Sequence, residues 1–196
     1  MKELVGRLQF IDTAASAAVD VSAQAPGEFV KPPTFTMVAY TGGPIRVEYW
    51  DLPVVIDLEG LKLKSRRPVF FNHQSNLDNL VGQTTKISRN TGQLLAEGRI
   101  MGDGETVKRI LTLSRNGYQF QASIGADVEE VEQLEEGQQQ TVNNQLIEGP
   151  ATIIRKATLR EISFVLNGAD DNTEVNVAAK AKELHKQESL VMEKEK

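Results

Sequence analysis

The sequence predicts a mainly β domain with flanking helices, and three observations lead to this fold class. From Phe35 onward, short β-branched or aromatic runs alternate with turn sequences such as GG, DLP, EG, SRRP and RNTG. Such closely spaced short strands are typical of a β-sandwich or a β-barrel. The chain has 196 residues, of which 40% are hydrophobic and 25% charged, and this suits one domain with a buried core. One stretch, residues 103–117, interrupts the strands with a helical pattern.

The elements expected in chain order begin with an N-terminal arm. Residues 1–33 are rich in Ala, Ser, Asp and Pro, and we expect at most one edge strand there, at Ala18–Val21. Residues 34–177 form the expected domain body, with strands at TFTMVAY, RVEYW, PVVIDL, PVFFNH, LVGQTTKI and LLAEGRI. Residues 178–196 hold strong helix formers and mixed charge, which predicts a charged helical tail outside the core.

The helix expected within residues 103–117 has recognisable ends. Asp103 is placed to cap its N-terminus, and Gly117 suits a left-handed residue after its C-terminus. Val107 and Ile110 fall on one face together with Leu111. We therefore expect this helix to pack over one side of the sheet.

Two strands and an insertion follow the helix. Residues 118–128 alternate between an apolar face and a polar face that holds Ser123. Residues 129–149 are acidic and rich in amides, which predicts a solvated loop or a projecting hairpin. The last strand is expected at residues 157–166, before the turn-rich NGADDN.

Composition argues against several classes of function. The net charge is −5 without a basic stripe, so we expect no nucleic-acid partner. The absence of cysteine excludes disulfides, thiolate nucleophiles and most zinc sites, and it suits a reducing cytoplasm. No apolar run approaches the roughly 20 residues that span a bilayer, and we expect neither a membrane segment nor a secretion signal. No calcium-loop spacing or glycine-rich phosphate loop is present, so no metal or other cofactor is expected.

A histidine is the scarcest reactive side chain of this sequence. The chain has 2 histidines, and because His185 lies in the charged tail, His73 is the one in the domain body. His73 ends a strand-like run over residues 67–73, where a polar loop begins. A neutral imidazole can take the proton of a serine hydroxyl near neutral pH. A hydrogen-bonded surface histidine without a catalytic role is the alternative.

Ser123 is the serine whose neighbours best suit a nucleophile. Ala122 leaves room beside it, and Gly125 lets the backbone turn so that N–H groups near Ile124 and Gly125 face a developing oxyanion. An ordinary small residue at a strand end is the alternative reading. Ser163 is a rival nucleophile that lacks a nearby glycine.

Glu161 is a carboxylate in an otherwise hydrophobic strand. A buried, unpaired charge costs several kcal/mol, so Glu161 must find a partner if it is buried. The sequence offers His73, and equally Arg155 or Arg160 in a structural ion pair.

Four segments in this order resemble a known family: RPVFFNHQSNLDNLVGQTTKI, LLAEGRI, GYQFQASIGADVEEVE and ATLREISFVLNGADDNTEVNV. They are similar to the prohead (capsid maturation) proteases of tailed bacteriophages and prophages, which are related in fold to the herpesvirus capsid maturation protease. The resemblance covers roughly residues 35–177 and implies a compact, closed or partly closed β-barrel surrounded by helices. It also implies a homo-oligomeric serine endopeptidase. Its substrates would be scaffold and capsid-protein segments, cleaved inside the assembling prohead in the cytoplasm of the bacterial host.

The resemblance also implies roles for individual residues. Ser123 matches the nucleophile, His73 the general base, and Glu161 the acidic position of the final strand, from which it would orient His73. The oxyanion would be stabilised by backbone N–H groups near Ile124 and Gly125, aided by Arg155. From its composition alone, a further hypothesis is that the charged tail serves co-assembly or targeting and is removed by self-cleavage.

The sequence departs from the shared pattern at Gln74, where most relatives carry an acidic or small polar residue, and in the insertion at 129–149. A second hypothesis is a non-catalytic capsid assembly or scaffolding domain with the same barrel. A third is an unrelated β-barrel binding module in which His73 and Ser123 lie on opposite faces.

Overall fold

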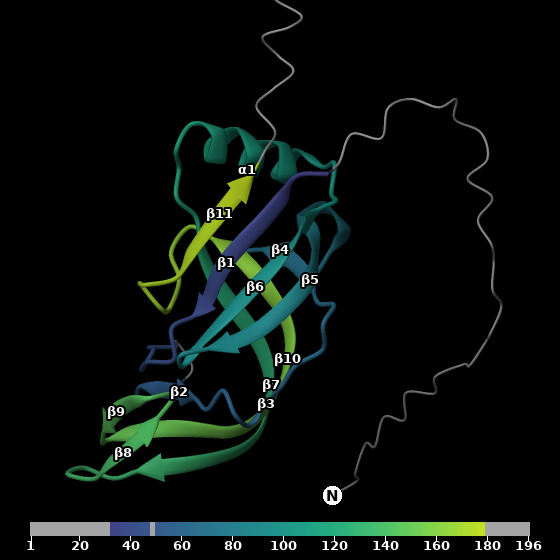
Figure 1. The fold of residues 1–196 in the computed structure, drawn as a ribbon. Helices are drawn as coiled ribbons and strands as arrows, with labels where there is room; N and C mark the ends of the chain where they lie inside the picture. Colours follow the sequence, from purple (N-terminus) through teal and green to yellow (C-terminus); the bar gives the residue numbers. More distant parts are fainter. Residues whose placement is uncertain (1–31, 48–49, 179–196) are drawn as a thin grey trace, which may run out of the picture. The chain divides into compact units, whose positions relative to one another are not determined.

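The computed structural model describes residues 32–47 and 50–178, and these form a mainly β fold (Figure 1). The strands are β1 (Thr34–Tyr40), β2 (Val54–Ile56), β3 (Leu61–Lys62), β4 (Pro68–Phe71), β5 (Leu80–Asn90), β6 (Gln93–Ile100), β7 (Gln121–Leu134), β8 (Gln139–Val142), β9 (Gln145–Glu148), β10 (Ala151–Val165) and β11 (Glu174–Ala178). In the described ranges, α1 (Glu105–Arg115) is the one α-helix, beside the short 3-10 helix η1 (Leu77–Asn79), where several flanking helices were expected. Within the same ranges, no helix is long and apolar enough to cross a membrane.

Some of the expected elements cannot be compared with this structure. The edge strand at Ala18–Val21 and almost all of the charged tail lie outside the described residues. The expected strand RVEYW falls partly outside them, and its described residues are not in a strand. Ile45, just before it, forms one isolated bridge with Val54.

The strand β10 organises the sheet. The nine-stranded sheet runs in the order β11-β1-β6-β5-β4-β10-β2, and β3 and β7 also pair with β10. One edge of β10 pairs in parallel with β2, β3 and β4, and its other edge pairs antiparallel with β7 (Figure 1). Most residues of β10 are buried. The candidates Ser123 on β7 and Glu161 on β10 therefore lie on directly paired strands.

The two ends of the sheet approach each other at one point. An isolated bridge joins Phe120 to Val175 of β11, and the Val175 N–H donates to the Phe120 carbonyl at 3.0 Å. From Gln121 onward, β7 pairs only with β10 among the described strands, and beyond Ala122, whose backbone groups bind the Thr173 hydroxyl, its other edge is open. A single bridge is not a continuous ladder, so the closed barrel stays a prediction.

An aromatic cluster fixes the strands behind the candidate site. The ring of Phe164 on β10 packs edge-to-face against Phe35 of β1 at 5.6 Å and against Phe120 at 5.9 Å. All three side chains are fully buried. Such pairs add to the stabilisation that burial alone provides. Because side chains alternate along a strand, Phe164 faces this cluster and its neighbour Ser163 faces the site.

The helix α1 differs from its prediction at one end. Gly104 occupies the N-cap position without any side-chain hydrogen bond, so the expected cap by Asp103, one residue earlier, is wrong. Gly117 has φ of +86°, which confirms the left-handed residue after the helix. Val107 and Ile110 are buried in the main core, which confirms that this face packs on the sheet.

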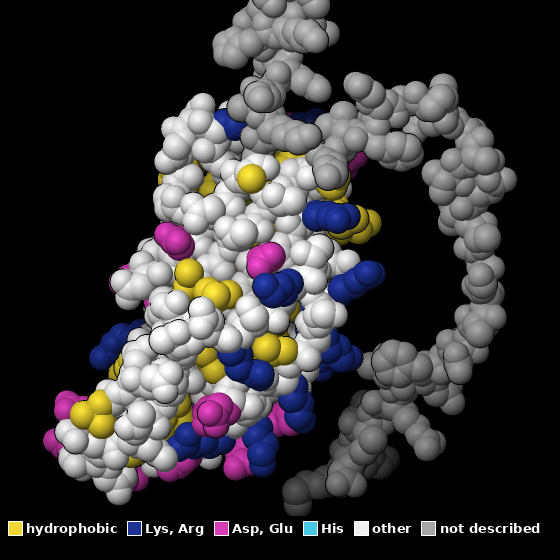
Figure 2. Space-filling view, viewed as in Figure 1, with side chains coloured by type: hydrophobic (Ala, Val, Ile, Leu, Met, Phe, Trp, Pro, Cys, Tyr) yellow, Lys and Arg dark blue, Asp and Glu magenta, His cyan; other side chains and the backbone are white. Residues whose placement is uncertain are grey.

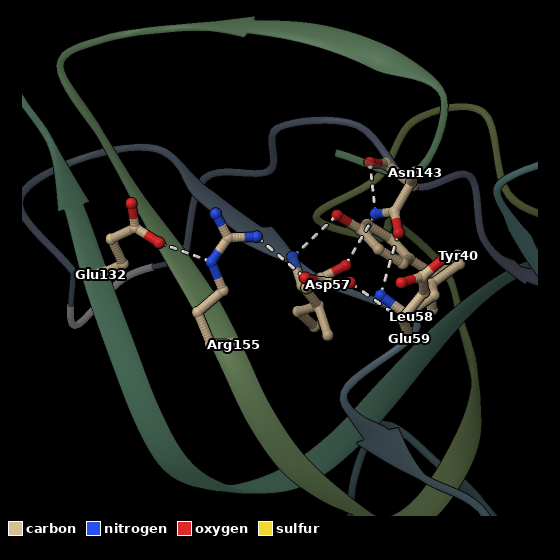
Figure 3. A network of polar contacts seen from close by, with 9 residues as sticks. Tyr40, Asp57, Leu58, Glu59, Glu132, Asn143 and Arg155 are labelled. Atoms are coloured by element: carbon tan, nitrogen blue, oxygen red, sulfur yellow. Dashed lines mark hydrogen bonds and ion pairs between the residues drawn. The ribbon is translucent and has the colours of Figure 1, made fainter. Parts of the chain in front are cut away.

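The insertion at 129–149 is a projecting hairpin whose apolar residues form a second core cluster together with Val55 of β2 and with Ala151 and Ile153 of β10. The strand β7 continues to Leu134, and β8 and β9 follow as a two-stranded sheet. Val142 and Ile147 are buried with Leu134. The turn is also anchored, because the Asn143 amide donates to two backbone carbonyls at 2.9 and 2.8 Å and accepts the Leu58 N–H at 2.9 Å (Figure 3).

Candidate active site

The imidazole of His73 joins the other two candidate catalytic side chains. Its Nε2 lies 2.8 Å from Ser123 Oγ, and its Nδ1 lies 2.7 Å from Glu161 Oε1. With a hydrogen on Nδ1 donated to the carboxylate, Nε2 is free to accept the hydrogen of the serine hydroxyl. The three residues come from separate segments, and the structure brings all of them together. This geometry rules out a fold in which His73 and Ser123 lie on opposite faces.

His73 lies in a left-handed turn rather than in the strand that the sequence predicts over residues 67–73. The strand β4 ends at Phe71, and Asn72 and His73 then adopt positive φ angles of 50° and 57°. Such angles are uncommon for residues with a side chain and need support from their surroundings. Two hydrogen bonds to β10 supply it: the Asn72 N–H donates to the Phe164 carbonyl at 2.9 Å, and the His73 N–H donates to Ser163 Oγ at 3.1 Å.

The pairing of β7 with β10 sets the positions of Ser123 and Glu161. In this register Ser123 lies opposite Ser163, and Gly125 lies opposite Glu161. Residues two apart share one face of a strand, so all four face the same side. A Cβ atom on Gly125 would lie 2.3 Å from Glu161 Oε1, which shows that the carboxylate lies directly over this glycine.

Glu161 is buried, with 8% of its surface exposed, and its two oxygens have different partners. Oε1 lies 2.7 Å from His73 Nδ1, and Oε2 accepts a hydrogen bond from the Ser163 hydroxyl at 2.7 Å. Of the two ion pairs that the sequence left open, neither forms. Arg160 pairs with Asp127 instead.

Ser163 is no rival nucleophile in this structure. The residue is completely buried, and its hydroxyl both donates to Glu161 and accepts the His73 N–H. Both interactions occupy the hydroxyl and keep it away from any substrate. Sequence reasoning missed its contact with the site, although its position two residues after Glu161 places both side chains on one face.

Arg155 does not contribute to the site, so the oxyanion role expected for it is wrong. It lies six residues before Glu161 on β10, about 20 Å along an extended strand. Its guanidinium donates to Asp57 Oδ2 at 2.9 Å and to Glu132 Oε2 at 2.6 Å (Figure 3). The sequence gives no sign of these two carboxylates, because they come from distant segments.

Of the two expected backbone donors, Ile124 is the one directed to the open side. The N–H and C=O of Ala122 both bind the Thr173 hydroxyl, at 3.0 and 2.9 Å, so they point away from β10. Backbone groups alternate in direction along an antiparallel pair. The Ile124 N–H therefore points to the open edge of β7, beside Ser123, whereas the Gly125 N–H points toward β10.

A cleft of about 490 Å³ opens at this edge and includes His73 and Ser123. Its walls are largely apolar. The apolar lining residues include Ile45, Trp50, Ile124, Ala126 and Val128. The polar ones include Arg46, Asn72, Asn167 and Asp170. Tyr40 braces one wall, since its hydroxyl donates to the Gly43 carbonyl at 2.5 Å and accepts the Ile56 N–H at 3.1 Å. Burial raises the pKa of Tyr40 far above its usual range, so it stays neutral.

Comparisons with known proteins add little to this geometry. No protein-family model matches the chain, and no curated protein sequence matches it. Partial structural similarity exists to the protease of Kaposi's sarcoma-associated herpesvirus. Its complex with a hexapeptide phosphonate inhibitor has a TM-score of 0.42 and 12% identity, covering 81% of this chain and 71% of that one. Its complex with an allosteric inhibitor has a TM-score of 0.42 and 10% identity, covering 79% and 82%.

Proposed function

We propose that the chain is a serine endopeptidase, with Ser123 as the nucleophile, His73 as the general base and Glu161 as the group that orients His73. One observation carries this proposal. A single imidazole contacts a hydroxyl at 2.8 Å and a buried carboxylate at 2.7 Å, at the wall of an open cleft. This is the arrangement that activates a serine for acyl transfer.

The reaction follows from these contacts. Ser123 Oγ attacks the peptide carbonyl carbon while its proton moves to His73 Nε2, and Glu161 stabilises the imidazolium. The Ile124 N–H donates to the oxyanion that forms. The C–N bond then breaks as His73 gives its proton to the leaving amine. Water, deprotonated by the same imidazole, hydrolyses the acyl-enzyme and restores the serine.

The open edge of β7 suits a peptide in extended conformation. Unpaired strand edges bind extended peptides through main-chain hydrogen bonds, and pockets beside them select side chains. Because the cleft wall is mainly apolar, the preferred substrate presents apolar side chains to it. The sequence resemblance leads us to propose that these segments belong to scaffold and capsid proteins. Cleavage would take place inside an assembling prohead in the host cytoplasm, by a homo-oligomer.

A labelling experiment tests the chemistry directly. The folded full-length chain is expected to react with a fluorophosphonate probe, and peptide mass spectrometry should find the adduct on Ser123. Ser123→Ala should abolish labelling, whereas Ser88→Ala on β5 should leave it unchanged. A folded chain that does not react would contradict the proposal and favour the non-catalytic assembly domain.

A co-expression experiment tests the substrate class. The chain is produced with the scaffold and capsid proteins of a tailed phage, and the products are separated on a gel. Processing should occur with the wild-type chain and stop with Ser123→Ala or His73→Ala. Processing by Ser123→Ala at the wild-type rate would show that another residue or another enzyme cuts these proteins.

A further inference from the structure

We infer that Ser163 is a positioning residue of this site, with one hydroxyl that holds both the Glu161 carboxylate and the backbone of His73, and that Gly125 provides the space this arrangement needs. The inference rests on the proposed function. It adds two residues to the site, and of these Ser163 is completely buried and cannot reach a substrate.

The hydrogen bonds of Ser163 connect both sides of the His73–Glu161 contact. Its hydroxyl donates to Glu161 Oε2 at 2.7 Å and accepts the His73 N–H at 3.1 Å. The residue is 0% exposed, so no water competes for these bonds. A serine hydroxyl has one hydrogen to donate, and here it goes to the carboxylate.

The carboxylate of Glu161 needs this second contact to keep its orientation. The terminal torsion of a glutamate is soft, and a single hydrogen bond through Oε1 leaves the group free to rotate. The bond to Oε2 fixes the plane of the carboxylate. Oε1 then stays aimed at His73 Nδ1, 2.7 Å away.

The backbone of His73 needs the same hydroxyl. Asn72 and His73 are two consecutive left-handed residues, with φ of 50° and 57°. This conformation is unfavourable by itself, and the bond from the His73 N–H to Ser163 Oγ stabilises it. The turn directs the imidazole toward Ser123, so Ser163 influences both contacts of the ring.

Gly125 is required because of where the carboxylate lies. A Cβ atom at this position would be 2.3 Å from Glu161 Oε1 and 3.1 Å from its Cδ and Cγ. The backbone of Gly125 has an ordinary negative φ, so its conformation alone does not demand glycine. An added methyl group would push the carboxylate away from His73 without substituting Ser163 itself.

A mutant cycle on the full-length chain tests the inference, with the rate at which a fluorophosphonate labels Ser123 as the readout. Ser163→Ala should label about 10- to 100-fold more slowly, since small displacements of catalytic groups have effects of this size. In a Glu161→Ala background the added loss should be at least about fivefold smaller, because residues that act through one another are not additive. Gly125→Ala should behave in the same way.

The matched control is Thr152→Val on the same strand, which removes a buried hydroxyl that donates to Gln133 Oε1 at 3.0 Å. It should label at the wild-type rate. Labelling of Ser163→Ala within about twofold of wild type would overturn the inference, and an equal loss with and without Glu161 would overturn the role that acts through the carboxylate. If Ser163→Ala does not fold, the Gly125→Ala cycle decides.

A spectroscopic readout separates this inference from the proposed function. In the ¹⁵N-histidine-labelled chain, the hydrogen-bonded Nδ1–H of His73 should give a downfield proton signal that is absent from Glu161→Ala. Ser163→Ala should weaken or shift this signal, and Thr152→Val should not. An unchanged signal in Ser163→Ala would overturn the positioning role. If wild-type Ser123 does not react at all, the proposed function fails, and the NMR result still decides the role of Ser163.

Discussion

The two halves of the β7–β10 pair carry polar side chains for different purposes. Near Ser123 and Glu161 the polar groups form a buried network around one imidazole. Farther along the same strands, carboxylates of β7 form ion pairs with cations of neighbouring strands: Asp127–Arg160, Glu129–Lys62, Glu130–Lys156 and Glu132–Arg155. Figure 2 shows Lys, Arg, Asp and Glu side chains intermixed on the surface around β3, β7 and β8.

Exposure to water separates the two halves. The side chain of Glu161 is 11% exposed, whereas the side chains of Glu130 and Lys156 are 51% and 58% exposed. Water and salt screen the exposed pairs, and such pairs contribute little to stability. A buried carboxylate without hydrogen-bond partners is energetically costly. Glu161 therefore keeps its hydrogen bonds to His73 and Ser163, and these fix its position. The same residue type is therefore a buried, proposed catalytic group at one place and a surface charge at another.

The sharpest test of this comparison changes one glutamate in each half. Glu161→Gln keeps the size of the side chain but removes the charge that stabilises the imidazolium, so we expect the labelling rate of Ser123 to fall about 10²- to 10⁴-fold. Glu130→Gln should change it by less than about twofold, because exposed pairs are weak. Equal rates for the two variants would show that burial does not distinguish these carboxylates.

The sequence predicts the candidate site better than its surroundings. His73 is the one histidine of the body, and Glu161 is a charge in a hydrophobic strand; each of these signals is local, and the structure brings both residues to Ser123. The left-handed turn at His73 was not predictable, because its support comes from Ser163, 90 residues away. The ion pairs of Arg155 were not predictable either, because its partners Asp57 and Glu132 come from distant segments of the chain.

The fold shows the same division between local and distant information. Alternation and turn residues predict the mainly β class, helical spacing predicts the helix, and composition leaves a solvated loop or a projecting hairpin at 129–149, since these features depend on neighbours in the chain. The order of strands around β10 depends on pairing between remote segments, and periodicity does not encode it. The contact that anchors the hairpin turn also depends on remote segments, because the Asn143 amide donates to the carbonyls of Gly42 and Ile56.

Asn143, in the β8–β9 turn of the hairpin that extends from the half with the ion pairs, gives a test of intermediate size. Asn143→Ala removes three hydrogen bonds and leaves buried backbone groups without partners, so we expect the free energy of unfolding in urea to fall by about 2–4 kcal/mol. Asn144→Ala is the matched control, because Asn144 is also left-handed in this turn, with φ of 64° against 52°. A loss of equal size in both variants would attribute the effect to backbone conformation rather than to the anchor.

The smallest expected effect concerns the ion pairs themselves. Hydrogen bonds from Lys62 at 2.6 Å and Thr158 at 2.7 Å hold the pKa of Glu129 below its usual value of 4.5. Because the folded-state pKa is the lower one, this carboxylate stabilises the fold above pH 4.5, and the contribution is lost as the pH falls through the folded-state pKa. Glu129→Gln should therefore lower stability slightly at neutral pH and make its decline below pH 4.5 shallower, as measured by urea unfolding. In 1 M salt, where the screening length is about 3 Å, the difference from wild type should shrink, because the pair is exposed. A difference that persists in high salt would mean that this half of the β7–β10 pair is as shielded from water as the half that holds Glu161.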